Sequence, residues 1–204
     1  MLYSALHSYQ EVTLEYYRTQ QFPDPSPEDR PFIQQFLWEI ITTIIPAVLI
    51  AFFINVYVAE AAEIEAGPSM QPNLYAGYRV MTEKISYYLH EPRRGDVVVV
   101  ERPETEGNLI KRVMGLPGEM VEVRNGHTYI NGEPVDEPWV ANFGGRSYPP
   151  TRIPEDYVFI LGDNRPVSRD SRDIGPVPID TIIGRGWFVY WPIEDFQFLP
   201  SPTP

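Results

Sequence analysis

The 204-residue sequence contains no cysteine and only 3 histidines. The missing cysteines exclude disulfides, thiolate metal sites and a cysteine nucleophile. His7, His90 and His127 are far apart in the sequence, so they do not form a metal-ligand spacing such as two histidines four positions apart. The sequence therefore predicts no metal site.

Basic residues are also few. The chain has 16 Lys and Arg against 28 Asp and Glu, which gives a formal net charge of −12. Nucleic-acid binding needs a basic face that neutralises phosphates, and adsorption to anionic lipid needs clustered Lys and Arg. The charge argues against nucleic acid as a partner and against membrane docking by charge alone.

Residues 40–59 form an apolar run without a charged residue, IITTIIPAVLIAFFINVYVA. At about 1.5 Å per residue this run spans roughly 30 Å, the thickness of the hydrocarbon core of a bilayer. Pro46 would break a soluble helix but is tolerated in a membrane helix. The alternatives are a buried helix and a cleaved targeting signal, but about 40 mostly polar residues precede the run and no basic segment abuts it. We predict a transmembrane helix in a lipid bilayer.

This run divides the chain into three regions. Residues 1–39 are an acidic and aromatic extension, with a short helical candidate near residues 8–20 and a proline-rich linker. Residues 40–59 are the anchor, and residues 60–204 are a soluble domain with a proline-rich tail. Too few Lys and Arg flank the anchor for the positive-inside rule, so charge does not predict its orientation.

The soluble domain has the pattern of a mainly β fold. Short runs rich in β-branched and aromatic residues indicate strands, and no long amphipathic helix pattern follows residue 60. Asn125-Gly126 separates two such runs and Asn131-Gly132 follows the second; Asn-Gly favours tight hairpins because both residues accept positive φ. The predicted strands cover residues 78–82, 96–101, 109–114, 119–124, 128–130, 156–161 and 182–190.

Two segments of this domain contain candidate reactive side chains. Residues 67–74 (GPSMQPNL) place Ser69 in a stiff turn between prolines, although alone this is an ordinary turn with an exposed serine. Residues 110–119 (IKRVMGLPGE) place Lys111 in an apolar strand pattern, where the lysine either points outward or is partly buried. Burial would lower the pKa of this lysine, and a neutral lysine can act as a base.

Two further segments of the soluble domain, together with the two above, form a set of four motifs. Residues 93–99 (RRGDVVV) are typical of a turn before a buried strand, and residues 162–173 (GDNRPVSRDSRD) of a polar loop that caps its own backbone. In this order, after an anchor, the four segments resemble the conserved boxes of type I signal peptidases. The boxes are Ser-Met-x-Pro at 69–72, Arg-Gly-Asp-Val-Val at 94–98, Lys-Arg-x-x-Gly-x-Pro-Gly-Glu at 111–119 and Gly-Asp-Asn-Arg-x-x-Ser-x-Asp-Ser-Arg at 162–172, within a resemblance that covers roughly residues 39–191.

The resemblance implies a serine protease with a Ser/Lys dyad and no cofactor. Ser69 would attack the scissile carbonyl, and neutral Lys111 would take its proton and return it to the leaving amine. The Ser69 backbone N–H is the expected oxyanion donor. Some members add a serine hydroxyl two residues before the nucleophile, a position that is Gly67 here, and Asn73 stands where threonine is common.

The resemblance also implies supporting residues. Ser168 corresponds to a hydroxyl that orients the lysine, and Met70 is expected to line the substrate pocket. The charged residues expected to brace the site by ion pairs are Arg112, Asp163, Asp170 and Arg172.

The implied substrate is the signal peptide of an exported preprotein, cut after a small-x-small site. The implied fold is an antiparallel β-domain with coiled sheets. The resemblance places this domain on the extracytoplasmic side of a plasma membrane, or in the thylakoid lumen of a photosynthetic organism, with the protein-export machinery nearby. An anchor would confine enzyme and substrate to one surface and raise their effective concentration.

Other functions fit parts of the sequence. A self-cleaving, repressor-type protease shares the Ser/Lys dyad, but such proteins are soluble and carry a DNA-binding or partner domain. An inactive, membrane-anchored binding module could add exported chains as a strand to a sheet edge. Intact Ser69, Lys111 and Ser168 disfavour that function and a purely structural one.

Overall fold

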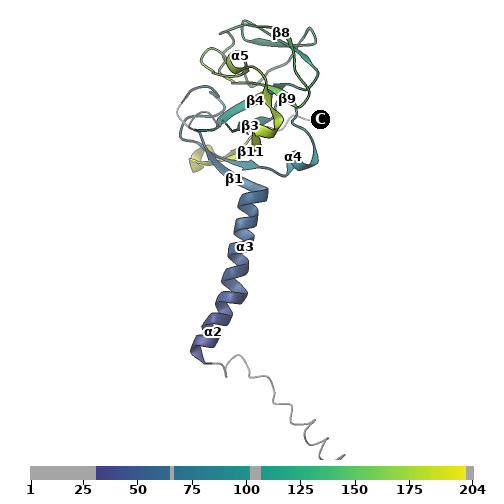
Figure 1. The fold of residues 1–204 in the computed structure, drawn as a ribbon. Helices are drawn as coiled ribbons and strands as arrows, with labels where there is room; N and C mark the ends of the chain where they lie inside the picture. The colour runs from purple at the N-terminus through teal and green to yellow at the C-terminus, as the bar shows by residue number, and fades with distance from the viewer. Residues whose placement is uncertain (1–30, 65–66, 102–106, 201–204) are drawn as a thin grey trace, which may run out of the picture. The chain divides into compact units, whose positions relative to one another are not determined.

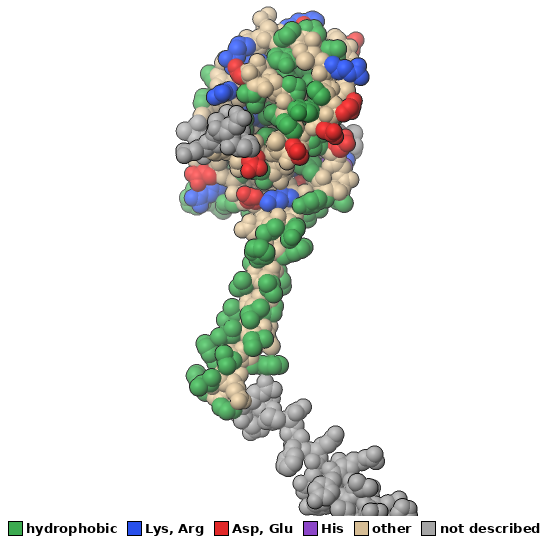
Figure 2. Space-filling view, viewed as in Figure 1, with side chains coloured by type: hydrophobic (Ala, Val, Ile, Leu, Met, Phe, Trp, Pro, Cys, Tyr) green, Lys and Arg blue, Asp and Glu red, His purple; other side chains and the backbone are tan. Residues whose placement is uncertain are grey.

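The computed structural model describes residues 31–64, 67–101 and 107–200, so the helical candidate near residues 8–20 lies outside the described residues. The chain divides into two compact units, residues 1–52 and 53–204. One helical run, Phe32–Val58, is long and apolar enough to cross a membrane, and hydrophobic side chains cover it (Figure 2). It consists of α2 (Phe32–Glu39), the π-helical η2 (Ile40–Ile44), α3 (Ile45–Phe53) and the π-helical η3 (Ile54–Val58).

This helix begins eight residues before the predicted start at Ile40, and it ends at Val58. The first turns contain Gln34, Gln35 and Glu39, which lower the hydropathy without preventing a helix. The wider π-helical turn directly precedes α3, in which Pro46 lacks the N–H that a regular helix would use. Ala59, predicted as the last anchor residue, has extended backbone and opens a strand.

The larger sheet is antiparallel throughout and has eight strands. Figure 1 labels its strands β3, β4, β9 and β11. Its order is β1-β2-β11-β3-β4-β9-β10, with β12 paired to β11. Bulges interrupt the pairing of β11 with β2 and with β3, and of β4 with β9, and such bulges increase the coiling of a sheet. The strands are β1 (Ala59–Glu63), β2 (Arg79–Glu83), β3 (Val97–Val100), β4 (Leu109–Gly115), β9 (Tyr157–Leu161), β10 (Val177–Pro178), β11 (Ile182–Trp191) and β12 (Gln197–Phe198).

A smaller antiparallel sheet has the order β7-β6-β5-β8. The hairpin between β5 and β6 turns at Asn125 and Gly126, whose φ values of 49° and 86° confirm the predicted Asn-Gly turn. The prediction of a mainly β fold is confirmed, since the helices after residue 60 are single turns in the described chain. The strands are β5 (Met120–Arg124), β6 (His127–Ile130), β7 (Glu133–Pro134) and β8 (Tyr148–Arg152); the short helices are α4 (Ser86–Leu89), α5 (Ser171–Ile174), η4 (Ile179–Thr181) and η5 (Ile193–Asp195).

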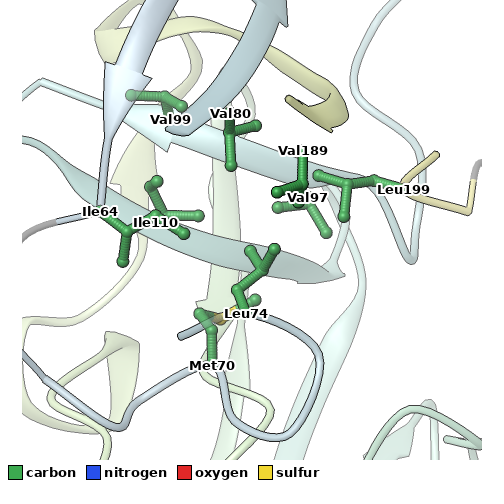
Figure 3. Close-up of a cluster of buried hydrophobic side chains, with 9 residues drawn as sticks. All are labelled: Ile64, Met70, Leu74, Val80, Val97, Val99, Ile110, Val189 and Leu199. Atoms are coloured by element: carbon green, nitrogen blue, oxygen red, sulfur yellow. The ribbon is translucent and has the colours of Figure 1, made fainter. Parts of the chain in front are cut away.

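Strand β3 is buried on both faces, which explains its unbroken run of valines. Val97 and Val99 pack into one core cluster, whereas Val98 and Val100 pack into another on the opposite face. A third cluster lies between the smaller sheet and β9. The first cluster matters for the site, because residues from the loop after β1 project into it (Figure 3).

Candidate active site

Ser69 lies in a turn whose neighbours are fixed in the core. The Leu74 N–H donates to the Met70 carbonyl over 3.0 Å, and both side chains project from the loop toward Val97 and Ile110 (Figure 3). Ser69 itself is half-buried. Burial of the residues that follow it gives this serine a fixed position.

Lys111 reaches the same hydroxyl from strand β4. It pairs with Val98 on β3, and its side chain is 3% exposed. Its Nζ lies 3.0 Å from Ser69 Oγ and donates to the Ile110 carbonyl over 2.8 Å. Two residues 42 positions apart in the sequence are therefore joined by a hydrogen bond between the two groups that a Ser/Lys dyad requires.

The loop after β9 packs against the serine turn. The Asn164 N–H donates to the Ser69 carbonyl over 2.9 Å, and Asn164 Nδ2 donates to the Pro68 carbonyl over 3.1 Å. Gly162 is wedged between Ser69 and Ser168: a Cβ on this glycine would lie 2.5 Å from the Ser69 carbonyl oxygen and 2.1 Å from Ser168 Oγ. Only a glycine allows this approach.

Ser168 is almost fully buried beside Gly162. Within the described residues its Oγ makes no hydrogen bond of good geometry, although the Ser168 hydroxyl is near enough to Asp170 to help lower the pKa of that carboxyl. A buried hydroxyl without a good hydrogen bond costs free energy, and such groups in native proteins usually have a reason to be kept. Ser168 thus retains the capacity to accept or donate one more hydrogen bond at the site.

Arg112 and Asp163 form a buried, two-pronged ion pair. Arg112 Nε and Nη2 donate to the two Asp163 oxygens over 2.8 and 2.7 Å, and Nη1 donates to the Gly95 carbonyl over 2.7 Å. Asn73 Nδ2 donates to Asp163 over 2.8 Å, and the Trp139 ring lies 4.6 Å from the guanidinium. The pair links strand β4 to the loop after β9 and satisfies most of its own polar atoms.

Asp170 and Arg172 form a second pair at the start of α5. Asp170 caps this helix, accepts two bonds of 2.8 Å from the Arg172 guanidinium and accepts the Gly162 N–H over 3.0 Å. Burial by itself raises the pKa of the Asp170 carboxyl, but the Arg172 charge and the Gly162 N–H outweigh it and lower that pKa below its usual value. The ionised carboxylate therefore stabilises the loop.

Asp170→Asn is expected to lower the free energy of unfolding at pH 7 by about 3–5 kcal/mol, because it leaves the Arg172 charge buried without a counter-charge. A lowered folded-state pKa means that this stabilisation is complete above the unfolded pKa of about 3.9 and is lost as the pH falls through the folded value. Urea unfolding of both proteins in detergent between pH 3 and 7 measures the difference. A difference that grows on acidification would contradict this assignment.

Met70, the predicted pocket residue, is 2% exposed and packs in the core with Leu74. Its side chain is not among those lining a nearby cavity, which has a volume of about 560 Å³. This cavity lies between strands β1, β2, β3, β4 and β11 and is bordered by Ala62, Val99 and Ile110. Ile110, the residue before Lys111, lines the cavity, whereas neither Ser69 nor Lys111 does.

Several residues of the site were not singled out from the sequence. Asn164 and Gly162 belong to the 162–173 loop, but nothing in the sequence of that loop indicates that these two residues pack against Ser69. Arg165 forms a buried ion pair with Glu137, which precedes it by 28 positions, so no spacing rule could pair them.

In the described parts of the chain, no cluster of three or more His, Asp or Glu side chains has the geometry to hold a metal ion.

A family model described as signal peptidase, peptidase S26, matches residues 37–191. The chain is 38% identical to a signal peptidase I of Leptolyngbya laminosa. The alignment spans 193 residues and covers 90% of this chain and 95% of the relative. It is 36% identical over 157 residues to thylakoidal processing peptidase 1 of Arabidopsis thaliana, covering 72% of this chain and 46% of that protein. A crystal structure of a signal peptidase I from Enterococcus faecalis is 32% identical and aligns over 47% of this chain and 97% of its own, with a TM-score of 0.43.

Proposed function

Because the chain belongs to the signal peptidase family, peptidase S26, we propose that it removes signal peptides from preproteins with Ser69 as nucleophile and Lys111 as general base. The observation that carries this proposal is the 3.0 Å contact between Lys111 Nζ and Ser69 Oγ. That distance lies within the range in which a base can take a proton directly.

In the proposed first step, the neutral Lys111 amine accepts the Ser69 hydroxyl proton while Oγ attacks the scissile carbonyl. The burial of Lys111 keeps its amine out of bulk water and beside Ser69 Oγ. The Ile110 carbonyl accepts one N–H of this amine over 2.8 Å and so helps to hold Nζ next to the serine. The ammonium formed then gives its proton to the leaving amine, and the acyl-enzyme is hydrolysed by water.

We propose that two further groups act on charges that develop during the reaction. The Ser69 N–H would donate to the oxyanion, and Gly67 supplies no side-chain donor beside it. Ser168 Oγ, which makes no hydrogen bond of good geometry among the described residues, would accept a hydrogen bond from the Lys111 ammonium. The Arg112–Asp163 and Asp170–Arg172 pairs would hold β4 and the loop after β9 in register.

The substrate chain is proposed to lie along the cavity beside Ile110. Side chains upstream of the cut would enter between β1 and β3, where Ala62 and Val99 border the cavity. Met70 would shape this region from the core below. Small residues before the cut would be selected because larger ones would move the scissile carbonyl away from Ser69.

The experiment that tests this function is cleavage of a preprotein with a small-x-small site by the full chain in detergent. We expect a single cut after the second small residue, identified by the new N-terminus of the product, and no cut when that residue is replaced by a bulky one. Absence of cleavage from pH 7 to 10 with several preproteins, together with retained preprotein binding, would instead favour an inactive binding module.

We further propose that the catalytic domain faces the extracytoplasmic side, or the thylakoid lumen, beside the export machinery. A signal peptide can be cut only where the translocated preprotein emerges. The similarity to a thylakoidal processing peptidase and the apolar helix Phe32–Val58 support a membrane-anchored enzyme at such a site.

A further inference from the structure

One buried ion pair joins the smaller sheet to the loop that supports the dyad. Arg165 lies in the loop after β9, and Glu137 lies between β7 and β8. Both side chains are 1% exposed, and Arg165 Nη2 donates to Glu137 Oε1. The strands of the smaller sheet contain none of the residues proposed above for catalysis, so this pair gives that sheet a direct connection to the site.

The pair belongs to a network in which most polar side-chain atoms of Glu137 and Arg165 form hydrogen bonds. Glu137 also accepts the Thr128 N–H over 3.1 Å and the Thr128 hydroxyl over 3.0 Å, both from β6. Arg165 Nη1 donates to the Gly126 carbonyl in the β5–β6 hairpin, and Arg165 Nε donates to the Gly162 carbonyl over 3.0 Å. One guanidinium therefore holds the hairpin, Glu137 and the Gly162 backbone together.

The backbone that Arg165 holds is the part of the loop that contacts the nucleophile. Gly162 leaves so little space that an added Cβ would lie within 2.5 Å of Ser168 Oγ and of the Ser69 carbonyl oxygen. Asn164, the residue before Arg165, donates its N–H to the same Ser69 carbonyl over 2.9 Å. A small shift of this backbone would therefore move Ser69 and Ser168 relative to Lys111.

We propose that Glu137 and Arg165 are positioning residues for the Ser69/Lys111 dyad. The smaller sheet serves as a fixed support against which this ion pair sets the Gly162–Asn164 backbone, and that backbone sets the nucleophile. The inference rests on the proposed function, because it assigns a role in the reaction of that same site.

A role in stability alone would give a different result. Replacing a buried ion pair by apolar side chains of similar volume is often neutral or stabilising for the fold, since both desolvated charges are removed. The double variant Glu137→Leu/Arg165→Met removes both buried charges at once, so no unpaired charge is left; it loses the bonds to Gly162, Gly126 and Thr128, and its folding is therefore checked before its kinetics. This variant therefore allows an effect on the stability of the fold to be measured separately from an effect on the position of the dyad.

The experiment compares kcat and KM for preprotein cleavage by the full chain in detergent, well below each variant's unfolding temperature. For Glu137→Leu/Arg165→Met we expect kcat to fall by about 100-fold, the effect typical of a misplaced reacting group, with KM within threefold of wild type. Arg165→Lys keeps the charge but cannot bond to Glu137, Gly126 and Gly162 at once, and we expect about a tenfold loss of kcat. Glu122→Gln, which breaks the exposed pair with Arg124 on the same sheet, is the control and should leave kcat unchanged.

A kcat within threefold of wild type in the folded double variant would overturn the positioning role. If the double variant does not fold, the folded Arg165→Lys protein provides the test. A kcat within threefold of wild type in Arg165→Lys would also overturn the positioning role. Two results would instead overturn the proposed function on which this inference rests. One is that the wild-type chain does not cleave the preprotein, and the other is that the Ser69→Ala variant cleaves it as fast as wild type does.

Discussion

Lys111→Met is expected to lower kcat/KM for preprotein cleavage by about 10⁴-fold or more, the loss typical of removing one member of a catalytic serine system. Methionine has a similar volume and suits the buried position, so the core around β4 should remain folded. It has no amine to take the proton of the Ser69 hydroxyl. The measurement is single-turnover cleavage, with the circular dichroism spectrum and unfolding temperature recorded for the same samples.

The chain offers a matched control for this substitution, because Lys84 is its only other lysine. Lys84 forms an ion pair with Glu60 and does not contact Ser69. Lys84→Met should keep kcat/KM within about threefold of wild type, as expected for a pair near the surface. A folded Lys111→Met protein that lost less than tenfold would mean that another group is the base.

Gly162→Ala is expected to lower kcat/KM by about 100-fold or more, although it adds a single methyl group. The new Cβ would meet Ser168 Oγ at 2.1 Å and the Ser69 carbonyl oxygen at 2.5 Å, so one or both serines must move. Displacing a reacting group by about 1 Å can cost a factor of 100. Steady-state kinetics on a preprotein measure the loss.

Gly186→Ala controls for a general effect of overpacking. Its added methyl group would meet the Leu199 side chain at 2.9 Å in the core, and it would not touch the serine loop. We expect this variant to unfold at a lower temperature but to retain wild-type kcat when folded. The role assigned to Gly162 is contradicted if Gly162→Ala and Gly186→Ala have the same kcat.

Three ion pairs with almost fully buried side chains meet on residues 162–172. Asp163 pairs with Arg112, Arg165 with Glu137, and Asp170 with Arg172 within the loop. Desolvation makes such pairs weak contributors to stability, whereas breaking one leaves an unpaired buried charge. Their concentration on one loop fits a need for exact placement of backbone against Ser69 more than a need for stability.

The parts of the fold that could be predicted are those with a strong local signal. The valine run of β3 and the Asn125-Gly126 hairpin have backbone preferences that tertiary contacts do not override. Strand β1 (AEAAE) was missed because its residues favour helices, and its pairing with β2 decides its conformation. Strand β8 was missed because Pro149 and Pro150 argue against a strand, although prolines are tolerated at the edge of a sheet, where β8 lies.

The candidate site could be predicted only as far as sequence motifs reach. Ser69 and Lys111 were identified through their motifs, and the structure brings them within hydrogen-bond distance. The Glu137 contact to Arg165 and the packing of Gly162 against Ser69 depend on the way two sheets and a loop meet, which no local pattern encodes. The lack of a hydrogen bond of good geometry at Ser168 Oγ among the described residues is likewise a property of the folded chain.

The most direct test of the Ser/Lys mechanism is cleavage of one preprotein by Ser69→Ala beside Ser168→Ala, both as folded full-length proteins in detergent. If Ser69 is the nucleophile, Ser69→Ala shows no cleavage above the uncatalysed background at any pH from 7 to 10, whereas Ser168→Ala keeps a reduced but measurable rate. Cleavage at the same site by Ser69→Ala at a rate within tenfold of wild type would contradict the mechanism.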